Sequence, residues 1–535
     1  MTKILTVFLL KYAVPLVGVV VALSFMVTVV WRVNSYSPNL DVTNIDASYH
    51  ALLTMKSLQQ GDGGEHLFLP IVTLTEDNAE KHISWGSTIP DGKGNYYYTS
   101  FPQLGFVVPL LLLKMFHAEI TIVNLMYINF LIEAVTIVLL MILVFRIFRD
   151  IKPTSTVSAI YFAGLVALAY MFSLEVFYSQ GLIYWAQSLM QPILIGQILT
   201  VYAIVASVRP RVYRVLILGL LILAGALIEW TGYISAAGIA AYFIYHAVRS
   251  KHFSYIIYTL AVACSAVIGL VAYIVPFIIN TSFNEYIAVS LQRFTARNVA
   301  ASIGPTFEQL ILSYFESFGP FIVVVTIGVA ILYVDKSSWT LFRAAVRQHR
   351  YLLVLAVLPL LENLIMKQHA YQYSFDRLKL FIPLAILFAI IYVSARSKRI
   401  RLVLTIMIVL CVPISMMQLR HSQRVVLNAG YQQTTGLIAK LRQDYPGASY
   451  SFSGPVRGWL NLQVGTNIHE AVMEYGKFSE SCTRTTCIWL IGSVKGTAQY
   501  DIRGAYVIEK KSGYVKTEGD TSCGSCGVTP PIILQ

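Results

Sequence analysis

The sequence predicts an α-helical polytopic membrane protein with about 11 transmembrane helices and a small α+β extracytoplasmic C-terminal domain. Of its 535 residues, 56% are hydrophobic and only 13% are charged, which is typical of integral membrane proteins. Apolar segments near or above the length that crosses about 30 Å of hydrocarbon recur along the chain. The expected spans cover residues 6–31, 120–147, 155–176, 184–207, 213–229, 231–247, 254–279, 319–335, 351–367, 379–395 and 400–418.

The net charge of +13 comes largely from Lys and Arg in five short connections, so it does not indicate a nucleic-acid partner. With eleven spans these connections all lie on one side, which the positive-inside rule makes cytoplasmic. The N-terminus is then inside, and loops 32–119 and 280–318 and the tail are outside, as expected for a bacterial inner-membrane protein. The clusters are Arg146, Arg149 and Lys152; Arg209, Arg211 and Arg214; Arg249 and Lys251; Lys336, Arg343, Arg347 and Arg350; and Arg396, Lys398, Arg399 and Arg401.

The chain divides into four expected parts. The first span is too long for a removed signal peptide and lacks a small-residue cleavage site, so we expect it to remain as a helix. After it, apolar residues at helical spacing predict a surface helix that ends at Gly61 and begins with Asn44 or Asp46 as its cap. Segment 101–116 contains two prolines and Lys114 and predicts an interfacial or half-inserted helix. The parts are a first transmembrane helix (1–31), an extracytoplasmic loop with juxtamembrane helices (32–119), a transmembrane bundle (120–419) and a C-terminal domain (420–535).

The cysteines agree with an extracytoplasmic tail. Cys264 and Cys411 lie within expected spans and are interpreted as packing residues. The four others lie in the tail and predict two disulfides with three possible connectivities. A four-cysteine zinc site is the alternative, because the last two form a C-x-x-C pair, but an oxidising compartment disfavours thiolate ligands. The tail cysteines are Cys482, Cys487, Cys523 and Cys526.

Asp46 is the candidate catalytic residue. It follows the first span by roughly 15 residues, inside the segment IDASYHA. A carboxylate at this place can accept a proton from an incoming hydroxyl or amine, although a lone Asp can also serve as a helix cap. Its context favours chemistry, because Tyr49 and His50 follow within one turn and Tyr98 begins an aromatic-proline segment that leads into an apolar helix.

These segments resemble the GT-C superfamily of membrane glycosyltransferases, which includes protein O-mannosyltransferases and lipid A aminoarabinose transferases. Members have an Asp, often in a D-E-x-x-Y motif, in the first extracytoplasmic loop, and a Y-P-P-L-like segment before the second membrane helix. Residues 46–50 (DASYH) and 98–104 (YTSFPQL) stand for these motifs. Ala47 stands where the motif has its second acid, so the role of that acid is unfilled here. One proline of the pair is also missing, and no subfamily is identified.

The resemblance implies transfer of a sugar from a polyprenyl-phosphate donor to an extracytoplasmic glycan, lipid or protein, with inversion. Asp46 would be the general base, and cations would be needed near the leaving phosphate. No cofactor is expected, and a divalent metal is not favoured because no acidic pair stands beside Asp46. The residues expected to bind substrate are Tyr49, His50, Lys56, Tyr98, Glu175, Arg293, Arg297, His369 and Arg377.

Simpler roles exist for several of these residues and their neighbours. Arg377 can pair with Asp376, and Lys367 and Lys379 can extend toward the membrane interface. The run 96–98 of three tyrosines can be an interfacial aromatic belt. A further polar group has no recognisable metal-ligand spacing; its members are His66, Glu76, Asp77 and His82.

Two other functions fit parts of the sequence. A glycan polymerase or ligase would use Arg293 and Arg297 in the 280–318 loop. A flippase or transporter of lipid-linked sugars would use Glu133, because acids within membrane spans are often functional. Transporters usually show internal repeats and matched broken helices, and neither is visible in the sequence.

Overall fold

The computed structural model describes residues 2–36, 40–61, 64–74, 87–153, 156–207, 212–297 and 306–422, and most of 424–518 apart from short gaps. The chain forms two compact units. We call the first the membrane unit; it contains Met1–Ser35, Met126–Tyr273 and Phe294–Ser422. We call the second the outer unit; it contains Tyr36–Leu125, Ile274–Arg293 and Gln423–Gln535.

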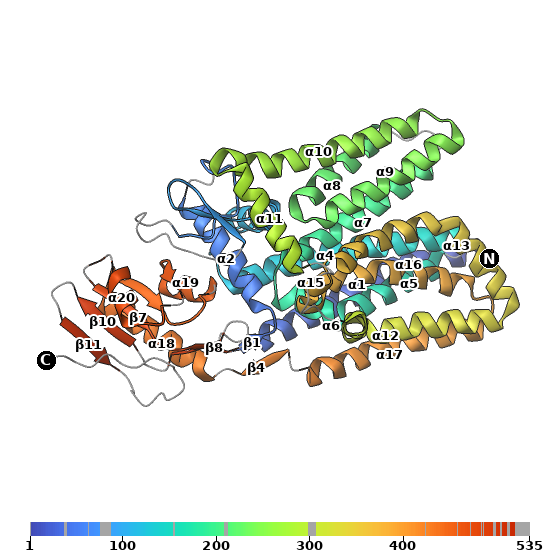
Figure 1. The fold of residues 1–535 in the computed structure, drawn as a ribbon. Coiled ribbons are helices and arrows are strands. Elements are labelled where there is room, and N and C mark those ends of the chain that lie inside the picture. Colours follow the sequence, from blue (N-terminus) through green and yellow to red (C-terminus); the bar gives the residue numbers. More distant parts are fainter. Residues whose placement is uncertain are drawn as a thin grey trace. The chain divides into compact units, whose positions relative to one another are not determined.

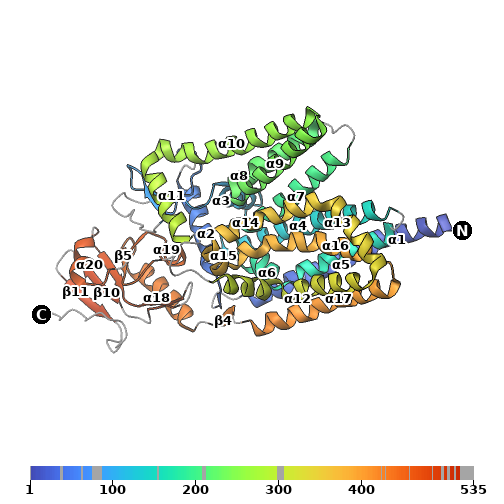
Figure 2. The ribbon, with the colours of Figure 1, turned by 45° about the vertical axis from the view of Figure 1, so that its right-hand side comes forward.

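The membrane unit consists of long apolar helices that run side by side (Figures 1 and 2). The described residues include eight helices long and apolar enough to cross a membrane, or nine if a pair bent by 64° is one span. The expected count of 11 is not confirmed. The predicted spans 213–229 and 231–247 are helices, α8 (Val212–Ile228) and α9 (Thr231–Ser250), but α8 has only 17 residues. The other helices are α1 (Thr2–Ser35), α4 (Ile122–Ile151), α5 (Thr156–Met171), α6 (Leu174–Phe177), η2 (Tyr178–Leu182), α7 (Ala186–Val205), α10 (Ser254–Asn280), α12 (Phe307–Val334), α13 (Lys336–Val357), η3 (Leu358–Leu360), α14 (Leu361–Ile365), α15 (Lys367–Gln372), η4 (Ser374–Leu380), α16 (Phe381–Ser394) and α17 (Lys398–His421).

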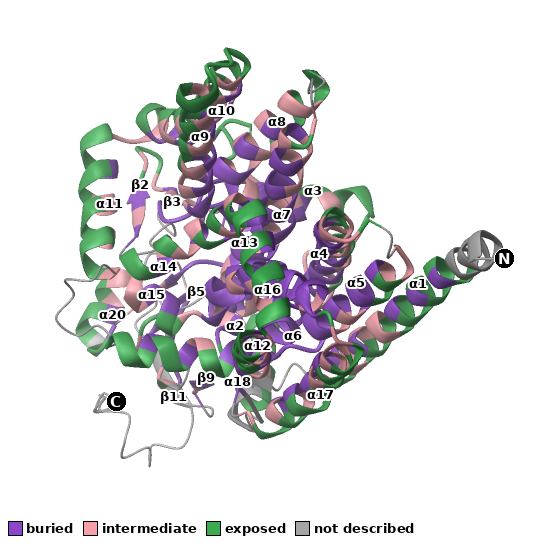
Figure 3. Cartoon of the chain, turned by 90° about the vertical axis from the view of Figure 1, so that its right-hand side faces the viewer, coloured by how far each residue is buried: buried purple, intermediate pink, exposed green. Residues whose placement is uncertain are grey.

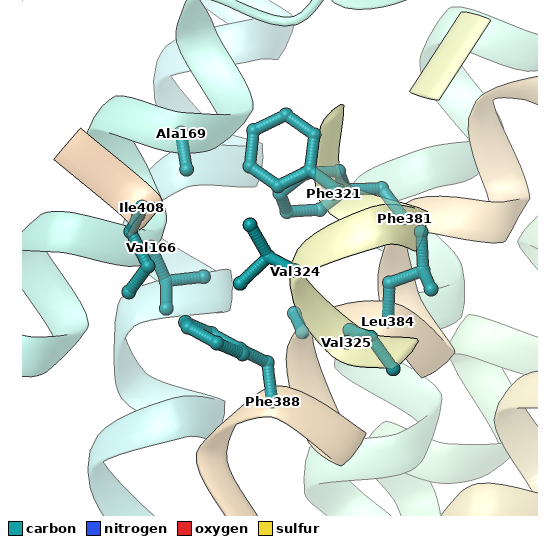
Figure 4. Close-up of a pocket in the computed structure, with 10 residues that line it drawn as sticks. Val166, Ala169, Phe321, Val324, Val325, Phe381, Leu384, Phe388 and Ile408 are labelled. Carbon is teal, nitrogen blue, oxygen red and sulfur yellow. The ribbon is translucent and has the colours of Figure 1, made fainter. Parts of the chain in front are cut away.

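Burial separates the central helices of the membrane unit from its periphery (Figure 3). The most apolar window of η4 and α16 is 78% buried, whereas those of α10 and α17 are 28% buried. A small cavity of about 20 Å³ lies beside α16, and Figure 4 shows that its lining is entirely apolar. Such a cavity lacks the polar partners that hold a water molecule, so we interpret it as a packing gap of the bundle core.

The outer unit combines the first outer loop with the tail. Its helices include α2 (Ile45–Gln60), α3 (Leu104–Met115), α18 (Ala429–Asp444), α19 (Gly458–Val464) and α20 (Tyr475–Ser481). Helix α11 (Phe283–Arg297) belongs to it as far as Arg293, and its last four residues belong to the membrane unit. A five-stranded mixed sheet has the order β11-β10-β7-β5-β6, in which β5 is parallel to β6 and β7 and the other pairs are antiparallel. This sheet and its helices confirm the small α+β region. Its strands are β5 (Ser449–Phe452), β6 (Ile468–His469), β7 (Thr486–Leu490), β10 (Tyr506–Lys510) and β11 (Tyr514–Glu518); the short pairs are β1 (Leu40–Val42) with β4 (Val425–Leu427), β2 (Thr88–Pro90) with β3 (Tyr96–Tyr98), and β8 (Ser493–Lys495) with β9 (Gln499–Asp501).

Contacts between the loop and the tail explain why they fold together. Strand β1 of the loop pairs with β4 of the tail. The side chain of Asn467 accepts a hydrogen bond from the Leu74 N–H (2.9 Å) and donates one to the Leu74 carbonyl (3.1 Å). Helix α19 packs on α2 so closely that a Cβ on Gly458 would lie 3.0 Å from the Tyr49 carbonyl oxygen. The tail therefore supports the helix that carries Asp46.

One of the predicted disulfides is present. Cys482 and Cys487 are bonded between the end of α20 and β7, which confirms a disulfide for this pair instead of a zinc site. Cys523 and Cys526 lie outside the described residues, as do Glu76, Asp77 and His82.

Candidate functional site

Asp46 lies in the first turn of α2 and does not cap it. The helix begins at Ile45, and Asn44 holds the cap position with φ 68° and no capping bond from its side chain. Neither predicted side-chain cap is therefore formed. A carboxylate in the first turn is stabilised by the helix dipole. Its oxygen Oδ1 is enclosed by the protein, so Asp46 combines a stabilised charge with limited access to water.

Aromatic rings surround the residue one turn after Asp46. The His50 ring lies 4.3 Å from the Tyr98 ring, edge to face, and 6.1 Å from the Phe106 ring (centroid to centroid). Burial, and secondly the nearby Arg293 guanidinium, lower the pKa of His50 to about 3. His50 is therefore a neutral imidazole at physiological pH, because its proton is lost far below pH 7.

The structure brings some of the predicted outer residues together. The side chain of Tyr49 hydrogen-bonds that of Tyr36. Burial, and secondly the nearby Tyr49, raise the pKa of Tyr36 above its ordinary value. Nε of Arg293 donates to Oγ of Ser100 at 3.3 Å, which places this cation beside the predicted 98–104 motif. We call Asp46, Tyr49, His50, Tyr98 and Arg293 the outer cluster.

Lys56 does not belong to the outer cluster. It lies ten residues after Asp46 on α2, which is about 15 Å of helical rise. Burial, followed by the nearby Arg442 of α18, lowers the pKa of Lys56. Its neighbourhood is the C-terminal domain, so the predicted substrate contact of Lys56 gains no support.

A broken helix positions the second predicted acid, in the membrane unit. Helix α5 ends at Met171, and the chain bends by 64° into α6 and the π-helix η2. Within η2, Gln180 leaves helical geometry (φ −115°, ψ 18°). Irregular backbone at membrane depth is tolerated where it is buried in protein or lines a water-filled cavity, and residues 172–188 are all buried.

Side chains of neighbouring helices satisfy the freed carbonyls of this segment. Nδ2 of Asn129 donates to the Ile183 carbonyl (2.6 Å), and Nη1 of Arg32 donates to the Gln180 carbonyl (3.3 Å). The same Arg32 nitrogen donates to Oε2 of Glu133 at 2.7 Å, with both side chains fully buried. Glu133 thus belongs to the scaffold that holds η2.

Glu175 and Arg377 meet through a shared serine. Oγ of Ser317 donates to Oε2 of Glu175 (2.8 Å) and accepts from Nε of Arg377 (2.8 Å). Nη2 of Arg377 lies 3.7 Å from Oε2 of Glu175, and all three residues are buried. Arg377 also donates to the carbonyls of Ala370 and Tyr371. The expected alternative pairing of Arg377 with Asp376 is therefore wrong.

Asp376 pairs with the predicted His369 instead. Oδ2 of Asp376 contacts Nδ1 of His369, and its Oδ1 accepts from Nε2 of Gln187 at 2.5 Å. Nε2 of Gln187 also donates to Oε1 of Glu229 at 2.6 Å. Burial lowers the pKa of His369, although Asp376 opposes this shift. Arg297, at the end of α11, is close enough to contribute to the same lowering.

Lys379 is a buried partner in this network and does not extend to the membrane interface. Nζ of Lys379 donates to Oε2 of Glu362 (2.7 Å) and Oγ1 of Thr231 (3.0 Å), and it lies 4.0 Å from Oε1 of Glu229. Only 2% of its side chain is exposed, which overturns the expected snorkelling role. We call this network of the membrane unit the inner cluster; it contains Glu175, Gln187, Glu229, Thr231, Ser317, Glu362, His369, Asp376, Arg377 and Lys379.

The inner cluster includes residues that sequence reasoning missed. Ser317 and Gln187 are ordinary polar residues at the ends of apolar segments, Glu362 lies within one, and no motif marks them. Their partners are far away in sequence: Gln187 and Asp376 are 189 residues apart. A charge within an apolar stretch was the one available signal, and it fits Lys379 and Glu362. Among the described residues, no group of three or more His, Cys, Asp or Glu side chains is arranged to hold a metal ion.

Comparison with known proteins identifies the fold. No protein-family model and no curated protein matches the sequence. Among solved structures, ArnT from Cupriavidus metallidurans bound to undecaprenyl phosphate matches with a TM-score of 0.51 and 10% identity, over 97% of this chain and 99% of that one. The oligosaccharyltransferase AglB from Archaeoglobus fulgidus, in complex with an inhibitory peptide and a dolichol-phosphate, matches with a TM-score of 0.50 and 13% identity, over 96% of this chain and 74% of that one. At these identities the likeness shows the fold alone, so the chain has the membrane fold of ArnT and AglB.

Proposed function

We propose that this protein is a GT-C-type glycosyltransferase that moves a sugar from a polyprenyl-phosphate carrier to an acceptor outside the cytoplasm. The observation that carries the proposal is the match to ArnT bound to undecaprenyl phosphate over nearly the full length of both chains. The position of Asp46 supports it, because the residue that the loop motif singles out is a partly enclosed carboxylate at a helix start.

In the proposed reaction, Asp46 accepts the proton of the acceptor hydroxyl or amine. The acceptor atom attacks the anomeric carbon, and the bond from that carbon to the phosphate oxygen breaks. The configuration inverts, and polyprenyl phosphate leaves with the bonding electrons. General bases of this kind contribute about 10²–10⁴-fold to the rate.

We assign the leaving phosphate to Arg293, the predicted cation that lies in the same unit as Asp46. Arg293 is partly exposed on α11, so a ligand can approach it from solvent. Substrate contacts of Arg297, and of Arg377, which is held by Glu175 and Ser317, stay predictions. His369 is buried and contacts Asp376 through Nδ1, and its contact with substrate also stays a prediction. Tyr98 and His50 supply aromatic surface for a sugar ring or isoprenoid.

The test compares Asp46→Asn with Glu119→Gln, an exposed acid of the same outer unit. Purified variants receive labelled polyprenyl-phosphate sugar and candidate acceptors, and transfer and donor binding are measured separately. We expect a loss of about 10²–10⁴-fold in transfer for Asp46→Asn, with donor binding retained and Glu119→Gln unchanged. Unchanged transfer in Asp46→Asn would remove the assigned base.

The transporter alternative relies on Glu133. The carboxylate of Glu133 accepts a hydrogen bond from Arg32, which also donates to the Gln180 carbonyl of η2, and this supports a structural role for Glu133. We therefore expect Glu133→Gln to lower stability more than it changes the transfer chemistry.

A further inference from the structure

A large cavity lies in the membrane unit, lined by α9 and α13 and by Val205 of α7, Leu358 of η3 and Leu361 of α14. Its volume is about 840 Å³, which is within the usual range of small-molecule sites. It shares no lining residue with the inner cluster. Both α9 and α13 are labelled in Figure 1.

The lining changes from apolar to basic along the helices. Ile234, Ala237 and Leu361 line one end, whereas His246 and Arg347 line the other. Ile234 and His246 are twelve residues apart on α9, which corresponds to about 18 Å of helical rise. A ligand that fills the cavity must therefore have a long apolar part and an anionic part at one end.

Small residues on α9 create the width of the apolar part. Ala237, Gly238 and Ala241 follow one another at helical spacing on the face toward the cavity. Gly238 is tightly packed, because an added Cβ would lie 2.3 Å from Cδ1 of Leu358. Ala237 and Ala241, in contrast, are exposed on this face. The space beside them therefore has an apolar lining that suits an acyl chain.

The basic end presents cations on a rigid aromatic support. Arg347 and Arg350 are both exposed and both line the cavity. Tyr242 stacks on Tyr351 with ring centroids 5.3 Å apart and an interplanar angle of 21°. Such stacking fixes the spacing of α9 and α13 at the place where the arginines emerge. Arginine forks suit phosphate oxygens in particular.

We propose that this cavity binds an anionic glycerophospholipid. Its phosphate contacts Arg347 and Arg350, and one acyl chain lies along Ala237 and Ala241. The basic end belongs to the leaflet that the positive-inside rule makes cytoplasmic, and basic pockets between membrane helices at that face suit anionic headgroups. This inference does not depend on the proposed transfer reaction.

The test uses native mass spectrometry of the full chain in detergent, with phosphatidylglycerol or phosphatidylcholine of identical acyl chains. We expect one phosphatidylglycerol to be retained about tenfold more strongly than phosphatidylcholine, because charge-assisted hydrogen bonds to its phosphate are the strong ones. The double variant Arg347→Gln with Arg350→Gln should remove that preference. Arg343→Gln is the matched control, because Arg343 is exposed on the same helix but does not line the cavity. Arg347→Lys with Arg350→Lys preserves charge and retains part of the preference.

A second variant tests the apolar part separately. Ala237→Phe fills the channel at a distance from the arginines and should reduce retention of phosphatidylglycerol about tenfold. Millimolar inorganic phosphate should not displace the lipid. Each variant is first shown to keep the elution volume and thermal midpoint of the wild type. Equal retention of both lipids, displacement by inorganic phosphate, an effect of Arg343→Gln equal to that of the double variant, or full retention in Ala237→Phe would each overturn the proposal.

Discussion

The outer cluster and the inner cluster hold charge in different ways. In the inner cluster, Arg377 and Lys379 each lie between acids and hydroxyls, and the hydrogen bonds link residues from several helices. In the outer cluster, Asp46 relies on a helix start, and its neighbours one turn later are a neutral histidine and aromatic rings.

This difference separates a cluster that stabilises the helices from the cluster that carries the proposed general base. Buried ion pairs cost desolvation, and removing one partner leaves a buried charge alone. The inner cluster therefore fixes the geometry of α6, η2 and η4. Asp46, in contrast, lies in the first turn of α2, where the helix dipole stabilises its charge. The assignment of Asp46 as base rests on its motif and on this position.

The largest expected effect comes from breaking the inner cluster. Arg377→Gln should destabilise the protein by about 3–5 kcal/mol, because it leaves Glu175 buried without its cation. The loss should be seen as a lower thermal midpoint in detergent. Adding Glu175→Gln should recover part of it, because the double variant no longer buries an unpaired charge. If the stability losses of Arg377→Gln and Glu175→Gln are simply additive, these two side chains do not stabilise each other as we infer.

A comparable change at Lys379 tests the neighbouring part of the same cluster. Lys379→Met keeps the length of the side chain but removes the donor to Glu362 and Thr231. We expect a loss of about 2–4 kcal/mol, somewhat smaller because Thr231 also bonds Glu362. Lys367→Met, half-buried in α15, is the control and should change the midpoint little. Similar losses in both variants would argue against a special role for the buried lysine.

The sequence predicts more of the fold than of the inner cluster. The outer loop, the α+β tail and the short 101–116 helix follow from local periodicity, and they appear as α2, the mixed sheet and α3. Local patterns cannot reveal the partner of a buried charge, because the partner is set by packing. Arg32 and Glu133 are 101 residues apart, and Lys379 looked like an interface residue because it precedes an apolar helix. The span count is not confirmed for a related reason, since α8 is short for a span and the α5–α6 segment is broken.

Acid titration tests the outer cluster through its histidine, His50. His50 has a pKa of about 3 in the folded protein, against about 6.5 in the unfolded chain. Below pH 6.5 the unfolded state binds more protons, so stability falls as the pH decreases from 6.5 toward 3 and rises in the other direction. At pH 5 the loss is about 2 kcal/mol. Thermal midpoints measured from pH 7 to pH 4 should follow this loss.

The matched variants of this titration are His50→Phe and His117→Asn. His50→Phe keeps an aromatic ring beside Tyr98 and Phe106 but removes the titrating group, so the slope of stability with pH should flatten. His117 is exposed with φ 52°, a conformation that Asn tolerates, and its replacement should leave the slope unchanged. A slope that persists in His50→Phe would assign the pH dependence to other groups.

The smallest expected effect concerns the contact that joins the loop to the tail within the outer unit. Asn467→Ala removes both side-chain hydrogen bonds to the backbone of Leu74 and should cost about 1–2 kcal/mol. Asn467→Asp keeps the acceptor for the Leu74 N–H but loses the donor, so its effect should be intermediate unless the buried carboxylate adds a desolvation cost. Hydrogen exchange is the suitable measurement, because faster exchange of the Leu74 amide reports local opening directly. Protection that is unchanged in Asn467→Ala would mean that β1 and β4 hold the loop by themselves, and the tail would then support α2 through strand pairing and α19 packing instead of this side chain.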